Sequence, residues 1–232
     1  MGKIYQFSSI GALMSGYFQP DQDVYNVCTC SSIGLGCSEQ LNAEVTILNG
    51  KVYTATAHQA IERPKAPFYT PFYQVTDFSN FKEQQILNTM QNTLEQELKH
   101  FVVLNNQFIA LRIDGFFHQL TLRRPQASDK KRTIKEVSAK QEVIAYQDIR
   151  GCLIGFWTPE IFSRISVPGL HLHFLSHDAS ISGHVLAYHI ESAKLQYEEK
   201  PTIEITHPQT TEFSQLNIDL KSLDQMIESV EK

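Results

Sequence analysis

The chain has 232 residues, of which 42% are hydrophobic and 19% are charged, and its formal net charge is −5. A chain of this length can bury a sizeable core without disulfide or metal support. Its negative net charge argues against a nucleic-acid or anionic-membrane partner, since both require clustered cationic side chains. We find neither a secretory signal nor an apolar run of about 18 residues, and therefore expect a soluble, cytoplasmic protein.

Strand signals dominate the first half of the chain. Residues 44–48 and 51–55 alternate apolar and polar side chains around Asn49-Gly50, the pair suited to the positive φ angles of a two-residue hairpin turn. A second hairpin is predicted in the same way, with residues 107–113 and 116–122 meeting at Asp114-Gly115. Between the hairpins we expect one helix that begins at Ser79 or Asn80. Its apolar residues recur at i, i+4 spacing and form one buried stripe: Ile86, Met90, Leu94 and Leu98.

The second half is predicted to form short strands and a terminal helix. The strands are expected at residues 151–157, 170–175, 183–190, 194–198 and 202–206, a spacing that favours an antiparallel barrel or sandwich. A helix over about residues 222–230 places Leu223, Ile227 and Val230 on one face.

The predicted fold class is α+β, in two closely packed regions that act as one functional unit. Residues 1–125 would form an N-terminal mixed β-sheet with flanking helices. Residues 126–232 would form a C-terminal, antiparallel, β-barrel-like region with the candidate site and the terminal helix.

The four cysteines do not resemble a secreted disulfide framework, because Cys28, Cys30 and Cys37 lie close together while Cys152 stands alone. The first three could in principle hold zinc. That interpretation is disfavoured, since the segment lacks the paired Cys-x-x-Cys knuckles of a structural zinc site.

Histidines are concentrated in one segment: five of the 9 fall between residues 171 and 189. His171 and His173, at i and i+2 on a strand, point to the same face, and an antiparallel return can bring His184 beside them. Three converging imidazoles suit a catalytic zinc or similar divalent ion with an open position. As ordinary core residues they would be costly to bury without partners. His177, in a loop, and His189, on the opposite face, are not expected to be ligands.

Several ordered motifs also carry a family resemblance. They are residues 5–17 (YQFSSIGALMSGY), 44–50 (EVTILNG), 70–72 (TPF), 112–115 (RIDG), 151–160 (GCLIGFWTPE), 171–176 (HLHFLS) and 183–186 (GHVL). Together they resemble the α-acetolactate decarboxylase family over nearly the whole chain, and the His-x-His-x10-His spacing is the one with which that family holds its metal.

The resemblance implies a metal-dependent carboxy-lyase that converts (S)-2-acetolactate into (R)-acetoin and CO2, as part of acetoin biosynthesis in the butanediol pathway. It implies that His171, His173 and His184 hold a divalent ion, with zinc expected, which stabilises an enediolate as a Lewis acid. It further implies that the protein forms a homodimer. The expected binding partner is the small-molecule substrate, and neither a nucleic acid nor a membrane is expected as a partner.

Three catalytic roles carry over by position. Arg123 matches the arginine that grips the substrate oxygens, although it could instead belong to a surface Arg123-Arg124 pair or exchange roles with Arg124. Glu44 matches the glutamate near the metal and is a candidate for proton transfer. Glu231 matches a glutamate in the tail that folds back over the site, with Glu228 as the alternative one helical turn earlier.

The chain departs from the family pattern in loops around the site. His177 and Ser182 replace an acid and a glycine, Ala187 stands where an acid is common, and Cys37 replaces a threonine. None of these changes removes a proposed ligand, so they affect loop shape, substrate fit and rate.

Two other functions compete with the decarboxylase. A cupin-like, metal-dependent oxygenase or isomerase on a small oxygenated acid would need a fourth ligand near His177, so His177→Ala would abolish metal binding there and spare it in a decarboxylase. In a binding module with a structural metal, His184→Ala would unfold the protein. Metal identity, enantiomer preference and physiological role stay open.

Overall fold

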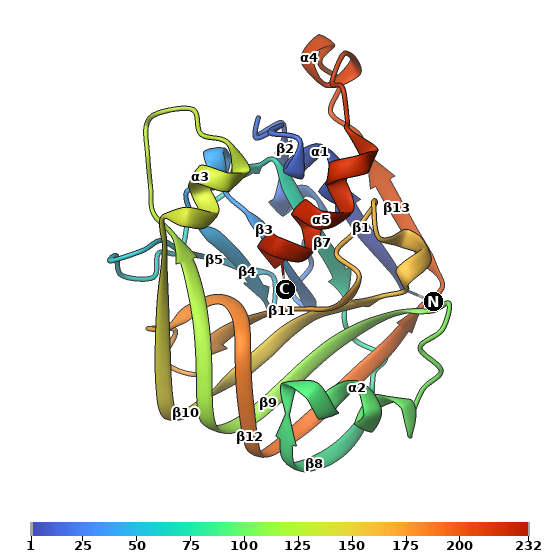
Figure 1. Ribbon diagram of the computed structural model, residues 1–232. Coiled ribbons are helices and arrows are strands. Elements are labelled where there is room, and N and C mark those ends of the chain that lie inside the picture. Colours follow the sequence, from blue (N-terminus) through green and yellow to red (C-terminus); the bar gives the residue numbers. More distant parts are fainter. Residues whose placement is uncertain (1, 232) are drawn as a thin grey trace.

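A computed structural model describes residues 2–231, with side chains described as far as Ile227, and consists of two packed β-sheets with short helices at their edges (Figure 1). The six-stranded sheet has the order β13-β1-β7-β3-β4-β5. Its strands are β1 (Lys3–Phe7), β3 (Ser32–Cys37), β4 (Glu44–Leu48), β5 (Lys51–Ala55), β7 (Phe72–Asp77) and β13 (Thr202–Thr206). Only β1 and β13 pair in parallel, so the sheet is mixed, as predicted.

The second sheet is antiparallel and has the order β11-β10-β9-β12-β8. Its strands are β8 (Lys82–Met90), β9 (Phe108–Pro125), β10 (Gln141–Thr158), β11 (Gly169–Ser176) and β12 (Ser182–Lys200). An additional pairing of β11 with β12 closes β9, β10, β11 and β12 into a ring. The predicted α+β class with a barrel-like antiparallel region is therefore confirmed.

Short elements complete the chain. Two small strands, β2 (Gln22–Asp23) and β6 (Tyr69–Thr70), pair with each other. The α-helices are α1 (Ile10–Met14), α2 (Gln91–Lys99), α3 (Ile134–Ala139), α4 (Thr211–Ser214) and α5 (Leu220–Glu231). Three single 3-10 turns are η1 (Val24–Val27), η2 (Glu39–Leu41) and η3 (Glu160–Phe162). No helix in the described part of the chain is long and apolar enough to cross a membrane.

The first predicted hairpin is confirmed. Strands β4 and β5 pair from Glu44 opposite Ala55 to Leu48 opposite Lys51. Asn49 and Gly50 connect them with φ angles of 51° and 68°, the positive values that a two-residue turn of this kind requires.

The second predicted hairpin is wrong, because β9 runs straight through Asp114 and Gly115. A Cβ atom at Gly115 would lie 2.3 Å from the Ser192 carbonyl oxygen and 2.4 Å from Ala193 Cβ on β12. Gly115 therefore permits close approach of two barrel strands, and its absent side chain serves packing instead of a turn.

The predicted long helix is half wrong: α2 covers only its second part, and β8 occupies the first. Strand β8 pairs with β12, placing Ile86 opposite Ala193. Ile86 still packs with Leu94 and Leu98 in one core, whereas Met90 is exposed. Backbone pairing with the long strand β12 outweighs the helical preference of these residues.

The strands of the second half are longer than predicted, since residues 183–190 and 194–198 lie in the single strand β12. Residues 202–206 form β13 as expected. The sheets do not divide the chain at residue 125, because β8 and β9 belong to the second sheet and β13 to the first. The two regions 1–125 and 126–232 stay a prediction about folding units.

The core lies mainly between and within the sheets. Ile4, Ile33 and Leu35 of the six-stranded sheet pack on Ala110 and Ile154 of the barrel. A separate cluster gathers α1, α3 and α5 above the end of the barrel, and includes Leu223 and Ile227 of the predicted terminal helix. These packed elements surround the site described next.

Candidate metal centre

Three of the predicted site residues lie side by side on three neighbouring strands. In the antiparallel ladder Arg123 of β9 is opposite His184 of β12, and His184 is opposite His173 of β11. Directly opposed residues point to the same face, and His171 shares that face because it lies two residues before His173. The barrel thus presents one row of polar side chains.

The three histidines converge as predicted. Their ring centroids are 5.0 Å apart for His171 and His184, 5.4 Å for His173 and His184, and 5.5 Å for His171 and His173. One nitrogen of each lies within 4.8 Å of the others. All three are buried, with exposures of 6%, 1% and 2% for His171, His173 and His184. The arrangement suits a divalent ion with three nitrogen ligands and an open position.

Strand β4 orients His173 from the opposite sheet. The Val45 carbonyl oxygen lies 2.9 Å from His173 Nδ1 and can only accept a hydrogen bond, so Nδ1 carries the proton. The lone pair of His173 is therefore on Nε2. Thr46 Oγ1 lies 3.4 Å from the same Nδ1 and 3.0 Å from the Oγ of Ser182, which begins the strand that carries His184. Such outer contacts fix the ring of a metal-ligating histidine.

Burial keeps the imidazoles neutral. Desolvation, together with the nearby Arg123 cation, lowers the pKa of His171 to about 3. Desolvation, then His171 and Arg123, holds the pKa of His173 well below its ordinary value. Both rings therefore offer unprotonated nitrogens at neutral pH, which is the form that binds a metal.

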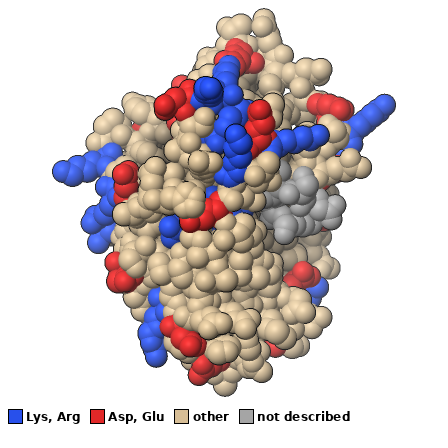
Figure 2. Space-filling view, turned by 60° about the vertical axis from the view of Figure 1, so that its left-hand side comes forward, with Lys and Arg blue, Asp and Glu red and all other residues tan. Residues whose placement is uncertain are grey.

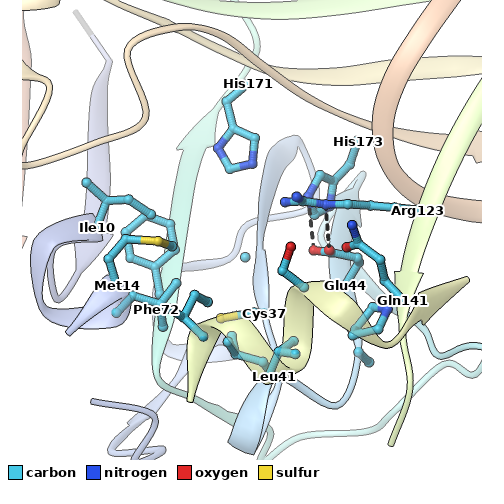
Figure 3. A pocket seen from close by; sticks show the side chains of 17 residues that line it. Ile10, Met14, Cys37, Leu41, Glu44, Phe72, Arg123, Gln141, His171 and His173 are labelled. Atoms are coloured by element: carbon cyan, nitrogen blue, oxygen red, sulfur yellow. Dashed lines mark ion pairs between the residues drawn. The ribbon is translucent and has the colours of Figure 1, made fainter. Parts of the chain in front are cut away.

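Glu44 joins the row from the six-stranded sheet. Its Oε1 lies 3.6 Å from Arg123 Nε, and its Oε2 lies 3.5 Å from His173 Nε2. The carboxylate therefore faces both the Arg123 guanidinium and the His173 ring (Figure 3).

The two arginines face different surroundings. Arg124 Nε donates a hydrogen bond of 2.7 Å to the Ser182 carbonyl oxygen, and its Nη2 lies 3.4 Å from the Tyr146 hydroxyl. Arg123, by contrast, lines the cavity beside Glu44. Both are buried, so the alternative of a solvated surface pair is wrong.

A small cavity of about 50 Å³ adjoins the row. Figure 3 shows His171, His173, Arg123 and Glu44 on one side of it and Ile10, Met14, Cys37, Leu41 and Phe72 on the other. Helix α3 adds Ile134, Val137 and Ser138. The cavity is therefore polar on one wall and apolar on the other, as in sites that fix a small ligand with few polar groups.

Sequence reasoning missed most of the wall. Nothing in the local pattern distinguished Gln141 and the α3 residues of this wall, or Thr46 behind His173, from ordinary strand and helix positions. The only available signal was the amphipathic sequence of residues 134–139, whose first turn carries the capping box of Thr133 and Glu136.

The other residues named from the sequence are two histidines, three cysteines and two glutamates, and only the glutamates lie outside the described side chains. His177 Nε2 lies 2.8 Å from Asp114 Oδ1, and His189 Nε2 lies 2.7 Å from Asn88 Oδ1, so both have partners away from the triad. Cys28, Cys30 and Cys37 form no metal-donor group among the described residues. Glu231 and its alternative Glu228 end α5, outside the described side chains.

Comparison with known proteins gives one consistent result. A family model for alpha-acetolactate decarboxylase matches residues 4–220. The alpha-acetolactate decarboxylase of Klebsiella aerogenes is 32% identical over 98% of this chain and 88% of its own length. That of Bacillus licheniformis is 27% identical over 100% and 92%. The crystal structure of alpha-acetolactate decarboxylase from Bacillus subtilis strain 168 superimposes with a TM-score of 0.93 at 25% identity, covering 99% of both chains.

Proposed function

The chain belongs to the alpha-acetolactate decarboxylase family, and from that premise we propose that it is a metal-dependent enzyme that decarboxylates 2-acetolactate to acetoin and CO2. The observation that carries the proposal is the convergence of the buried His171, His173 and His184 beside Arg123 and Glu44, at the polar wall of a cavity. An oxygenase or isomerase of the cupin type is not favoured, because His177 is engaged by Asp114 instead of the triad.

The donor set fits a resident divalent ion. The three imidazoles are buried, burial lowers the pKa of His171 and His173, and His173 is oriented by the Val45 carbonyl. We propose His171, His173 and His184 as its ligands, with zinc expected from the all-nitrogen set and its open position. When bound there, the ion supplies Lewis-acid stabilisation of negative charge on the substrate oxygens.

Arg123 is proposed to orient the anionic substrate. Its guanidinium lies on the cavity wall and is 5% exposed, so water competes weakly for its donors. A planar fork of donors can hold the carboxylate or vicinal oxygens bidentately, which fixes the bond to be broken relative to the histidine row. Arg123 thereby concentrates positive charge in a protein whose net charge is negative.

Glu44 is proposed to move the proton that replaces CO2. It lies within 3.6 Å of the Arg123 guanidinium and 3.5 Å of His173, so it borders the position of the reacting carbon without leaving the cavity. A carboxyl group held on one side of the substrate delivers its proton to one face, which would set the configuration of the product. We accordingly propose (S)-2-acetolactate as substrate and (R)-acetoin as product.

The apolar wall is proposed to exclude water and accept the methyl groups of the substrate. Ile10, Met14 and Leu41 form it together with Phe72 and α3. Figure 2 shows Lys and Arg side chains in the upper part of the face it presents, toward the end of the molecule where α3 lies, with Asp and Glu side chains around them. The positive charge that meets an anionic substrate is therefore assigned to the Arg123 guanidinium on the cavity wall.

Four finer statements complete the proposal. We propose a homodimer and a role in acetoin biosynthesis, as in the butanediol pathway, both from the family resemblance. We also propose a cytoplasmic location, from a sequence with only 4 cysteines that do not resemble a secreted disulfide framework. A catalytic contribution from Glu231 is supported by the packing of Leu223 and Ile227 of the same helix, α5, into the cluster around the cavity.

The proposal is tested by incubating the purified protein with racemic acetolactate and measuring acetoin, CO2 and the chirality of the product. Activity should disappear on chelation and return with a divalent ion. Acetoin production no faster than in a protein-free control, with metal present, would refute the proposal. Oxygen consumption with other small hydroxy acids would instead favour the oxygenase.

A further inference from the structure

A second group of metal-donor side chains lies on the same face of the barrel as the triad, further along its strands. Asp114 of β9 is directly opposite Cys152 of β10, and Cys152 is opposite Leu175 of β11. His177 follows immediately after the end of β11. Three different strands or strand ends therefore bring one carboxylate, one thiol and one imidazole together.

The contacts within this group are short. Asp114 Oδ1 lies 2.8 Å from His177 Nε2, and the Cys152 thiol is hydrogen-bonded to the Asp114 carboxylate. One donor atom from each of the three residues lies within 4.8 Å of the other two. Asp114 is the common acceptor, so the group is already gathered around a single point.

Arg112 prepares this group for a cation without blocking it. Its Nη2 lies 3.1 Å from Asp114 Oδ2 and leaves Oδ1 toward His177. This contact fixes the carboxylate plane, as outer partners do for metal-ligating carboxylates. Burial, and then the Asp114 charge, raise the pKa of the Cys152 thiol to about 12, and the Arg112 guanidinium opposes this shift only in part. A cation bound here would therefore have to displace the thiol proton directly.

We propose that Asp114, Cys152 and His177 form a second site for a thiophilic divalent cation of the zinc or cobalt class, independent of the decarboxylase centre. Sulfur, nitrogen and oxygen donors together select borderline ions over Mg²⁺ or Ca²⁺. On binding, the ion takes the place of the two protons that Asp114 now accepts. The thiol proton leaves to solvent, and the proton on His177 Nε2 moves through solvent to Nδ1, so that Nε2 offers its lone pair to the ion.

The two sites cannot share one ion. His173 and His177 are four residues apart along β11 and its end, a separation of roughly 13 Å for an extended chain. The environments also differ: the side chains of Asp114 and His177 are 31% and 51% exposed, so this site is reached from solvent. Cys152 is 2% exposed and anchors it from the interior.

An ion at this position would act on stability more than on catalysis. It would link β9 and β10 to the turn between β11 and β12, where Asp178 already accepts hydrogen bonds from Ser176 and Ser180. That turn leads directly into the strand that carries His184.

The test is a titration of the full-length, metal-free protein with Co²⁺. A thiolate ligand gives Co²⁺ a sulfur-to-metal charge-transfer absorption in the near ultraviolet, whereas the triad contains no sulfur. We expect two ions per chain, one of them with this absorption. Cys152→Ser should lower the stoichiometry from two ions to one and remove the band, while acetoin production is unchanged.

Control variants keep the result decisive. His177→Ala changes an exposed side chain and should weaken the same ion at least about tenfold even if Cys152→Ser fails to fold. Cys28→Ser and Cys37→Ser should keep the band, and so should His184→Ala, which tests the decarboxylase centre separately. Binding of one ion without a band, or a band that persists in both Cys152→Ser and His177→Ala, would overturn the proposal.

Discussion

Two clusters of metal donors occupy one face of the same barrel, and they differ in what covers them. The triad of His171, His173 and His184 is closed over by β4, α1 and α3, whereas the group of Asp114, Cys152 and His177 opens to solvent through His177. Both are built from neighbouring strands at matching register. The difference teaches that neighbouring strands are enough to gather metal donors, whereas elements packed against the barrel are needed to enclose those donors beside a cavity.

The largest expected effect comes from breaking the enclosed cluster. His184→Ala should lower kcat/KM by at least about 10²-fold, since removing even one group that stabilises developing charge costs about 10²–10³. Circular dichroism should remain that of the folded protein. The matched control His189→Ala, on the same strand but bonded to Asn88, should keep activity. Equal losses in the two variants would remove the basis for assigning the triad.

Replacing each of the two adjacent arginines by lysine tests how lining the cavity changes the role of an arginine. Arg123→Lys should lower kcat/KM by about 10²-fold, because a single ammonium cannot replace a planar fork of donors. Arg124→Lys should chiefly lower Tm, by a few degrees, through the loss of its bond to the Ser182 carbonyl. Steady-state kinetics and thermal melts of both variants decide the comparison, and a larger kinetic loss in Arg124→Lys would reverse the assignment.

Burial of the triad also predicts a pH dependence of stability in the metal-free protein. Because the pKa of His171 is lowered to about 3, the unfolded chain takes up a proton below about pH 6.5 that the folded chain does not. The free energy of unfolding should therefore fall by about 1.4 kcal/mol per pH unit for this residue between about pH 6.5 and 3. His173 acts in the same direction.

Denaturant unfolding at several pH values, with chelator present, measures this slope. His171→Gln should reduce it, since the replacement side chain does not titrate. An unchanged slope in that variant would mean that other groups control the acid sensitivity.

The smallest effect is expected from the contact that joins the sheets behind the triad. Thr46→Val keeps the shape of the side chain but removes the hydroxyl between His173 and Ser182. Metal affinity should fall by about tenfold, the lower end of the usual cost of an outer contact. Isothermal titration with zinc measures it. The Val45 carbonyl still orients the ring, so kcat at saturating metal should be nearly unchanged.

Local sequence patterns succeeded where neighbouring residues decide the structure. Asn49-Gly50 was correctly predicted as a turn because both residues accept positive φ and the flanking segments alternate. Asp114-Gly115 has similar composition but lies within β9, where Ser192 and Ala193 leave no room for a side chain. The two dipeptides adopt different structures because Gly115 packs against β12, a strand far away in the sequence.

The helix expected from residue 79 failed for the same reason. Lys82–Met90 carries good helix formers, yet the edge of β12 offered backbone partners for nearly its whole length. The part without such a partner, Gln91–Lys99, became α2.

The sequence by itself determined the shared face of His171 and His173, since alternation along a strand needs no knowledge of the rest of the fold. Together with the family resemblance, it also nominated His184, Arg123 and Glu44. Only the tertiary structure decided that these residues meet at matching register and that β4, α1 and α3 cover them. The reason is physical: periodicity is encoded over a few residues, whereas register and burial are set by contacts between segments far apart in the chain.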